Sequence, residues 1–581
     1  MDEWDLTTLF YNDQIFFDEV QNLKNKTSEL EQITDIKLEE SILTHILNLQ
    51  QSLLEKAHKI LLYGSLRYYQ NVTDSKTEEL KSISEKTSNE IIDKIESWNK
   101  DNIRFTKKEW DEFLINHPSL KVFDYYMIKF YRTQDHILHE QSSSSKKEEI
   151  RKEVAEYNSK LKKEEYGTIE INDSVEELTS SNIAKFLAAS DGNTRRKTYN
   201  ILKEHDSKEA DFYSQLLNKI YKSRVELASN EKYPTVRSKV LIEQNLPSSL
   251  IDNLIFITKK HLALIQEYFK VKAKLLNIES PHMYDLGVPF QNTRIHYDLN
   301  DAIKNTQEAL SCLGTTYINF LLELQDKKHL NLIPTDFKHQ TITFSWDDYV
   351  FTNYKGSYVD MKNIAHEVGH ALNYHFSNQK QPIFSYQDST AFLGEIASTT
   401  NELLLNRYLQ KTASTIEEKI FYLSKNIENF YTSIIKPVMY TEFESTLYAK
   451  IENNDELSTD FINETYKKLV EAYHKNSVEL EDFNSSEWIR LGQIYRYNYY
   501  YYQYATGLLI SSHIVEEVID KKTLPLEKYL DFLSLGSSQD DKELLKSINV
   551  DISNTDFIEN GFRFLEIELN TLKEIVKEIE Q

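Results

Sequence analysis

The chain has 581 residues, and its 68 basic and 92 acidic side chains give a formal charge of −24. This length is sufficient for two or three domains, or for one large helical body with a substantial interior. The negative charge repels nucleic-acid phosphates and anionic lipid surfaces, so we expect neither nucleic acid nor a membrane as a partner.

The cellular compartment is indicated by cysteine usage and by the amino-terminal residues. The single cysteine, Cys312, excludes an intramolecular disulfide and favours a reducing compartment. The first residues are acidic where a secretion signal is basic, and no stretch approaches 18 apolar residues without a charge. We therefore expect a cytoplasmic protein.

Helical periodicity dominates the chain, which contains only 12 Gly and 9 Pro. Apolar residues recur at spacings of three and four over 42–66, and similar stripes run through 212–227 and 250–275. No internal repeat of fixed period is evident, which argues against a solenoid. We predict a mainly α fold, with an amino-terminal helical lobe over 1–200 and the reactive centre within 201–581.

One segment departs from the helical pattern. TITFSWDDYVFTNYKGS, at 341–357, is rich in Thr, Phe, Val and Tyr and ends at a glycine, so it predicts one or two strands. A small sheet inside a helical protein leaves a free edge. Such an edge can bind an extended peptide through main-chain hydrogen bonds.

The next segment contains HEVGH, in which His366, Glu367 and His370 form an H-E-x-x-H pattern. Four helical residues advance about 400°, so the two histidines lie on one face of a helix, one turn apart. Two imidazoles in that geometry can share one zinc ion, and Glu367 can act as general base toward a water on it. The pattern therefore predicts a hydrolytic zinc site.

A catalytic zinc also needs a third protein ligand. A third histidine ten residues after the first is excluded because Phe376 occupies that position, and His375 points away from the motif as a surface or packing residue. The helix predicted over 392–410 offers Glu395, which is our preferred third ligand. Glu402, two turns later on the same face, is a candidate for contacting a metal ligand without binding the metal itself, but we expect it to be an exposed glutamate.

Zinc chemistry of this kind predicts hydrolysis of an amide bond. Attack on the carbonyl creates an oxyanion, and neutral phenols can donate hydrogen bonds to it without competing for the metal. Seven of the ten residues from Tyr495 to Tyr504 are tyrosines, so this tract is a candidate source of such donors.

Several segments together resemble a known family. The combination of HEVGHALNYHF, FLGEIASTTNE and YYQYATG is similar to the oligoendopeptidase F branch of the M3 zinc metallopeptidases, relatives of thimet oligopeptidase. WDLTTLF, HMYDLGVPF and TNYKGSYVDMKNIAHE extend the resemblance over almost the whole chain. It implies a large helical ellipsoid with a deep channel, a zinc on its floor and a small sheet beside the zinc helix. Such a channel favours short unstructured peptides as substrates.

The resemblance also implies individual roles. His366, His370 and Glu395 correspond to the ligands of one Zn²⁺ per chain, and Glu367 corresponds to the general base and proton shuttle. The segment DYVFTNYKG, at 348–356, corresponds to the family's substrate-binding edge strand.

The tyrosine tract resembles the segment that supplies transition-state donors in this family. Tyr502 occupies the position of a tyrosine that usually faces the zinc, and Tyr495 is the second candidate. On one continuous helix, Tyr495, Tyr499 and Tyr502 would share a face, and we expect the remaining tyrosines to pack. Ile494 is a departure, because this branch usually has a histidine there and isoleucine donates no side-chain hydrogen bond.

Three functions remain open on sequence alone. The first is a zinc endopeptidase for short oligopeptides in general. The second is a dedicated processing peptidase for one signalling or antimicrobial peptide, and the third is a catalytically impaired peptide-binding relative. The complete set of His366, Glu367, His370 and Glu395 favours an active enzyme. Cleavage preference and oligomeric state are not determined by the sequence.

Overall fold

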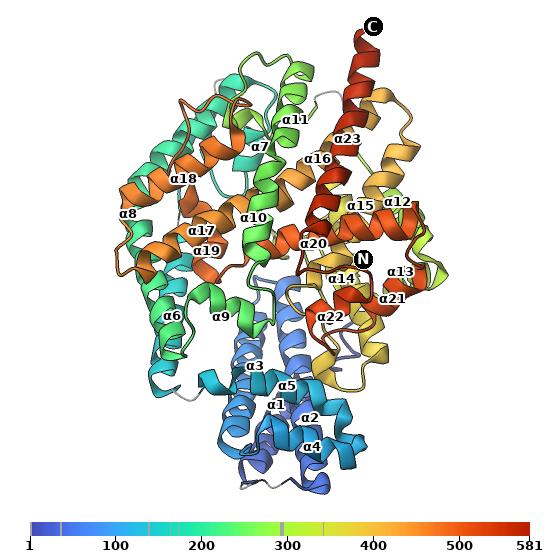
Figure 1. The fold of residues 1–581 in the computed structure, drawn as a ribbon. Helices are drawn as coiled ribbons and strands as arrows, with labels where there is room; N and C mark the ends of the chain where they lie inside the picture. The colour runs from blue at the N-terminus through green and yellow to red at the C-terminus, as the bar shows by residue number, and fades with distance from the viewer. Residues whose placement is uncertain are drawn as a thin grey trace. The chain divides into compact units, whose positions relative to one another are not determined.

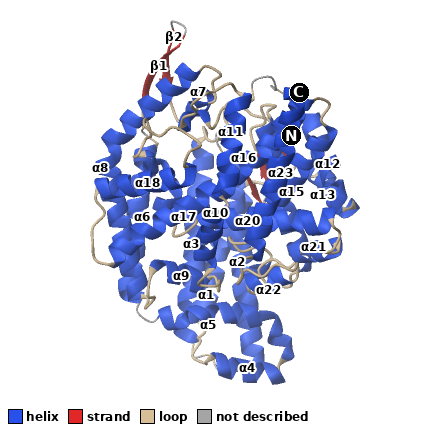
Figure 2. Cartoon of the chain, turned by 45° about the horizontal axis from the view of Figure 1, so that its top comes forward, coloured by secondary structure: helices blue, strands red, loops and turns tan. Residues whose placement is uncertain are grey.

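The computed structural model describes residues 3–34, 36, 38–137, 140–162, 164–171, 174–290, 295–340 and 342–581. The described chain is predominantly helical, with two small β-sheets (Figures 1 and 2), so the predicted mainly α fold is confirmed. It divides into two compact units, each built from three chain segments: Met1–Ile137, Ile295–Tyr408 and Ile514–Asn549 in the first, and Leu138–Arg294, Leu409–His513 and Val550–Gln581 in the second. The predicted boundary at residue 200 falls inside a single helix, so the units do not follow it.

The first unit combines a helical bundle with the three-stranded sheet and the helices around it. Its elements are α1 (Asp13–Glu31), α2 (Glu40–Gln70), α3 (Ser75–Asn102), α4 (Lys107–Asn116), η1 (Pro118–Phe123), α5 (Asp124–Ile137), α12 (Leu299–Leu310), η3 (Ser311–Leu313), α13 (Thr315–Asp326), β3 (Leu330–Asn331), β4 (Phe344–Trp346), β5 (Tyr349–Phe351), α14 (Tyr358–Lys380), η4 (Phe384–Tyr386), α15 (Gly394–Thr412), η7 (Val515–Asp520), α21 (Leu526–Leu533) and α22 (Asp541–Lys546).

The second unit is helical apart from one β-hairpin. Its elements are α6 (Glu140–Leu161), β1 (Gly167–Ile171), β2 (Ser174–Leu178), α7 (Ile183–Leu187), α8 (Gly192–Asn230), α9 (Val236–Glu243), α10 (Leu250–Lys260), α11 (Leu262–Leu275), η2 (Met283–Asp285), α16 (Ile416–Phe430), η5 (Tyr431–Ile435), α17 (Lys436–Glu452), α18 (Thr459–His474), η6 (Glu487–Arg490), α19 (Gly492–Arg496), α20 (Tyr501–Ile514) and α23 (Asp556–Glu580). Across the described residues of both units, none of the helices is long and apolar enough to span a membrane.

Helices α1, α2 and α3 pack against one another in the first unit (Figure 1). The stripe predicted over 42–66 is the buried face of α2, where Leu53, Ile60 and Leu66 are fully enclosed. Close approach of α2 and α3 depends on Gly64, because a Cβ there would overlap the side chain of Ser84.

The three-stranded sheet has the order β3-β5-β4, with β3 parallel and β4 antiparallel to β5. The predicted strands at 341–357 are therefore present, although Thr341 lies outside the described residues. The amino terminus is fastened to this sheet, because the indole N–H of Trp4 donates to the carbonyls of His329 at 2.9 Å and Val350 at 3.2 Å. The segment at 348–356 is the predicted edge strand, but its strand β5 is central and pairs on both sides, so that prediction is wrong. Strand β4 forms one edge of the sheet, and both β4 and β5 contact α14.

In the second unit, the long helix α8 contacts α6, α17 and the β1–β2 hairpin (Figure 2). The apolar stripe predicted over 250–275 is present but belongs to two helices, α10 and α11. The chain departs from helical geometry at His261, whose backbone N–H still bonds to the end of α10.

Candidate metal centre

Helix α14, which carries the H-E-x-x-H motif, begins at a well-defined cap. The hydroxyl of Ser357 accepts from the N–H of Asp360, and the Asp360 carboxylate accepts from the N–H of Ser357, which completes a capping box. Gly356 precedes the cap with φ +90°, and a Cβ there would overlap the ring of His296. A glycine is therefore needed to turn the chain from the sheet into the helix.

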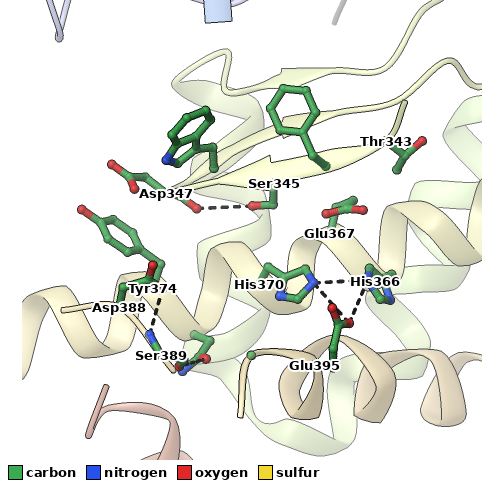
Figure 3. Close-up of a pocket in the computed structure, with 14 residues that line it drawn as sticks. Thr343, Ser345, Asp347, His366, Glu367, His370, Tyr374, Asp388, Ser389 and Glu395 are labelled. Atoms are coloured by element: carbon green, nitrogen blue, oxygen red, sulfur yellow. Dashed lines mark hydrogen bonds and ion pairs between the residues drawn. The ribbon is translucent and has the colours of Figure 1, made fainter. Parts of the chain in front are cut away.

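The structure brings together the three predicted metal ligands (Figure 3). The Nε2 atoms of His366 and His370 lie 3.2 Å apart. The Oε2 atom of Glu395, from the first turn of α15, lies 3.5 Å from Nε2 of His366 and 3.7 Å from Nε2 of His370. All three ligand atoms lie within 4.8 Å of one another, and this is the one such group of three or more ligating side chains found among the described residues.

These distances suit a tetrahedral cation. Ligand atoms at about 2.0–2.2 Å from one zinc ion are separated by roughly 3.3–3.6 Å in tetrahedral geometry. Two imidazole nitrogens and one carboxylate are also a ligand set of catalytic zinc sites, which leave a fourth position open. The three side chains therefore fit Zn²⁺ in both spacing and chemistry.

Helix α15 approaches α14 closely enough to deliver Glu395 because Gly369 has no side chain. A Cβ on Gly369 would lie 2.6 Å from Cα of Ser398 and 2.8 Å from the carbonyl oxygen of Ala397. The same pair of helices is joined by Asn401, whose amide donates to the carbonyl of Ala365 at 2.9 Å. The glycine of HEVGH is thus a packing requirement of the metal site.

Glu402 is not exposed, so the prediction made for it is wrong. Only 5% of the residue is accessible, and its carboxylate lies 2.7 Å from Nδ1 of His366 and 3.0 Å from Nζ of Lys362. With its proton on Nδ1, His366 presents the lone pair of Nε2 to the metal position. The signal in the sequence was the spacing of seven residues from Glu395, which places both glutamates on one side of α15.

The two histidines have opposite electrostatic environments. Burial disfavours the protonated form of His366, but the hydrogen bond that its Nδ1–H donates to Glu402 and the nearby carboxylates outweigh burial and raise the pKa to about 9. Burial dominates at His370 and lowers its pKa to about 4. Since a metal binds the neutral ring, loading this site near neutral pH should release a proton from His366.

Glu367 projects from the same helix toward strand β4, and only 5% of it is exposed. Burial and the carboxylates of Glu395 and Glu402 outweigh the opposing effects of His366 and the backbone N–H of Ser345, and together they raise the pKa of Glu367 to about 7. A carboxylate with a pKa near neutrality is suited to both accept and return a proton.

A cavity of about 300 Å³ opens beside these residues, lined by β4, α14, the start of α15 and the segment at 388–389 (Figure 3). Residues 343–346 form one of its walls. The N–H of Ser345 faces Glu367, so part of the β4 backbone points into this cavity and away from β5.

His375 does not take part in the site. Its ring lies 4.1 Å from the buried ring of Phe320, and its Nε2 is 2.8 Å from the amide of Gln379. The prediction that His375 is a surface or packing residue is therefore confirmed.

The tyrosine tract belongs to the second unit and is not one continuous helix. Helix α19 ends at Arg496, Tyr497 is extended, and Tyr499 has φ +48° before α20 begins at Tyr501. The prediction that Tyr495, Tyr499 and Tyr502 share one helical face is therefore wrong.

Two buried polar side chains stabilise this break. The Arg224 guanidinium donates to the carbonyls of Ile494 at 2.9 Å and Tyr495 at 2.7 Å. The Glu444 carboxylate accepts from the N–H of Tyr499 at 2.8 Å. Both come from helices distant in sequence, so no local pattern indicates that the chain breaks here.

The two predicted phenolic donors differ in their surroundings. The hydroxyl of Tyr502 donates to Gln244 at 2.8 Å. Tyr495 is fully buried, with its ring 4.1 Å from Tyr157 and 6.1 Å from Tyr213, and its hydroxyl has no hydrogen-bond partner in the described part of the chain. This environment is typical of a packing residue, and the catalytic roles of Tyr495 and Tyr502 stay predictions.

The helical fold, the paired histidines and the third carboxylate define the class of protein: a metallopeptidase of the H-E-x-x-H type with a glutamate on the following helix. The sequence profile of peptidase family M3 matches residues 185–314 and 344–564, which is more than half of the chain. This chain belongs to peptidase family M3, and it is therefore an enzyme that hydrolyses peptides.

Individual relatives extend this result over the full length. The Group B oligopeptidase PepB of Streptococcus agalactiae is 24% identical over 593 residues, which cover 99% of this chain and 97% of the relative. The oligopeptidase PepF of Bacillus subtilis is 23% identical over 600 residues, covering 100% and 88%. The predicted resemblance to oligoendopeptidase F is confirmed.

Solved structures share the fold. A structure from Chlamydophila abortus superposes with a TM-score of 0.86 at 25% identity and covers 98% of both chains. The oligoendopeptidase-F of Enterococcus faecium gives a TM-score of 0.76 at 21% identity, covering 97% of this chain and 99% of the other.

Proposed function

We propose that this protein is a zinc endopeptidase that cleaves internal bonds of short, unstructured peptides. The observation that carries the proposal is the convergence of His366, His370 and Glu395 on one position beside Glu367, in a cavity with an edge strand as one wall. When bound, Zn²⁺ polarises a peptide carbonyl and lowers the pKa of water.

Glu367 is the proposed general base. Its raised pKa allows it to take a proton from the attacking water and to return that proton to the nitrogen of the departing amine. The hydrogen bond from the N–H of Ser345 orients the carboxylate of Glu367 and leaves it able to accept a proton. His366 is held in its ligating tautomer by Glu402.

Strand β4 is the proposed binding edge for the substrate main chain. It is the outer strand of its sheet and also a wall of the cavity, so an extended peptide added to it would lie next to Glu367. Main-chain pairing accepts many sequences, which supports the proposal of general oligopeptide cleavage. We also assign Tyr502 the role of a transition-state donor, on the basis of the family resemblance.

Metal analysis combined with a quenched-peptide assay tests the proposal. The wild-type protein should bind one zinc per chain and cleave several unrelated short peptides at internal bonds. The Glu367→Gln variant should retain the zinc and lose at least about a thousandfold in kcat. A zinc-loaded wild type with no more activity than this variant would overturn the proposal.

A further inference from the structure

The cavity has a second polar end, formed by Asp347, Tyr374, Asp388 and Ser389, which we call the acidic end (Figure 3). Tyr374 lies one helical turn beyond His370 on α14, a rise of about 6 Å. Successive residues of an extended peptide advance by about 3.3 Å. A peptide group at the acidic end is therefore about two residues from one at the metal position.

At this end of the cavity, the carboxylate of Asp347 already has two hydrogen-bond partners. Nε2 of His58, from helix α2, lies 2.8 Å and 3.0 Å from its two carboxylate oxygens. The hydroxyl of Tyr374 bonds to the same carboxylate. Asp347 occupies the turn between β4 and β5 with φ +53°, so these bonds also hold the hairpin in place.

Asp388 has no comparable partner. Its Oδ1 accepts from the N–H of Ser389 at 2.8 Å, and no ion pair joins it to a Lys, Arg or His within the described ranges. Desolvation and the neighbouring Asp347 raise the pKa of Asp388, while the N–H of Ser389 and the imidazole of His58 oppose the shift. The side chain itself is exposed, so a ligand in the cavity can reach its carboxylate. The cavity lining contains no Lys or Arg, and its cationic candidates are the two metal-binding histidines.

A cluster of acidic side chains on an open surface would not by itself indicate a ligand. Here the cluster is a wall of the same cavity that contains the three metal ligands and Glu367, so a ligand that reaches the reactive centre also faces Asp388. The carboxylates of Glu395 and Glu367 are engaged by the histidines and by Ser345. Asp388 is the cavity carboxylate that accepts from a backbone N–H and forms no ion pair with a Lys, Arg or His of the described residues.

We propose that the acidic end is a substrate subsite that binds a positively charged nitrogen of the peptide, within about two to three residues of the cleaved bond, through the carboxylate of Asp388. This proposal rests on the proposed peptidase function and specifies its substrate class. The cation is either the free amino terminus of a short peptide or a lysine or arginine side chain, and both offer N–H donors to the same carboxylate.

Matched peptides distinguish the two sources. One series carries lysine or its uncharged analogue norleucine at each of three positions on either side of the cleaved bond. A second series has a free or an acetylated amino terminus at those distances. We expect kcat/KM to fall at least about tenfold when the charge is removed at one position, either by norleucine or by acetylation.

The Asp388→Asn variant keeps an oxygen for the N–H of Ser389 and removes the charge. It should reduce the preference for the charged peptide to less than about threefold, with little change for the neutral peptide. Asp336→Asn is the matched control, because Asp336 is an exposed acid of the same unit that does not line the cavity. This control should keep the wild-type preference.

Binding to zinc-loaded Glu367→Gln, followed by fluorescence anisotropy, gives a second readout that does not require turnover. Equal dissociation constants and equal kcat/KM for charged and neutral peptides would overturn the subsite, as would a preference that survives in Asp388→Asn. A charge preference in binding without any hydrolysis by the wild type would leave the subsite standing and refute the proposed function instead.

Discussion

The carboxylate of Glu402 lies 2.7 Å from Nδ1 of His366, and it is itself buried. Burial alone would raise the pKa of Glu402, but Lys362 and His366 outweigh burial and lower it to about 2. The glutamate is therefore ionised behind a ligand histidine, an arrangement that fixes the tautomer and makes Nε2 a better donor to the metal.

The first prediction concerns this pair. Replacing Glu402 by Gln keeps the size of the side chain but removes the charge that orients His366. We expect zinc affinity to fall by about 10- to 100-fold, as is common for partners of ligand histidines. Competition with a chromophoric chelator measures the affinity directly.

Glu323→Gln is a suitable control for this measurement. Glu323 is a partly exposed glutamate of the same unit whose carboxylate pairs with Lys327, the residue that caps the end of its helix α13. Its replacement should leave the zinc affinity unchanged. Wild-type affinity in Glu402→Gln would show that the buried contact does not support the metal.

The second prediction concerns the close contact between α14 and α15. Gly369→Ala would place a methyl group 2.6 Å from Cα of Ser398, so the helices must separate or strain. We expect a loss of about 1–3 kcal/mol in unfolding free energy and weaker zinc binding, because Glu395 moves with α15. Gly394→Ala is the control, since no atom lies within 4 Å of a Cβ at that position. Equal effects of the two substitutions would contradict this account.

The sequence predicts the metal ligands because their geometry is local. His366 and His370 share one helix, and Glu395 begins the next helix after a short return, so helical periodicity and one loop are sufficient. The mainly α fold and the strand pair before α14 follow from the same local patterns.

Features that depend on distant residues were not predictable in this way. The break in the tyrosine tract is stabilised by Arg224 on α8 and Glu444 on α17, which lie far from the tract in sequence. The prediction of a shared face assumes one continuous helix through the tract, and these tertiary contacts interrupt that helix. Likewise, Asp388 gains its position in the cavity only when the hairpin turn at Asp347 and helix α14 come together.

The third prediction concerns pH and Glu444. Burial raises the pKa of this carboxyl from 4.5 to about 8, although the N–H of Tyr499 and the charge of Arg224 oppose the shift. The stabilisation linked to its proton is complete below pH 4.5, and it is lost as the pH rises toward 8, because the unfolded chain ionises first. The loss is at most about 5 kcal/mol, since each unit of pKa shift corresponds to about 1.4 kcal/mol.

Urea unfolding at several values between pH 5 and pH 8.5 measures this effect. Glu444→Gln should flatten the decline in stability, because its amide oxygen still accepts from Tyr499 and cannot ionise. Glu456→Gln provides the control. Glu456 is exposed, and its pKa is lowered from 4.5, so it does not titrate within the pH range of the measurement. The same pH slope in wild type and Glu444→Gln would refute the assignment.

The last prediction separates the two candidate phenols. If Tyr502 donates to the oxyanion, Tyr502→Phe should lower kcat about 100-fold, with little change in KM. Tyr497→Phe is the matched control, because Tyr497 lies in the same tract and is 50% exposed. Its substitution should leave kcat within about twofold of wild type.

Tyr495 provides the critical comparison. If it packs against Tyr157 and Tyr213, Tyr495→Phe removes a buried hydroxyl that has no partner in the described part of the chain, so stability should not fall and kcat should change less than about threefold. If it acts as a catalytic donor, as the resemblance implies, the loss in kcat must approach that of Tyr502→Phe. Wild-type kcat in Tyr502→Phe would remove the tyrosine tract from the mechanism, and would leave Glu367 and the metal as the groups that act on the peptide bond.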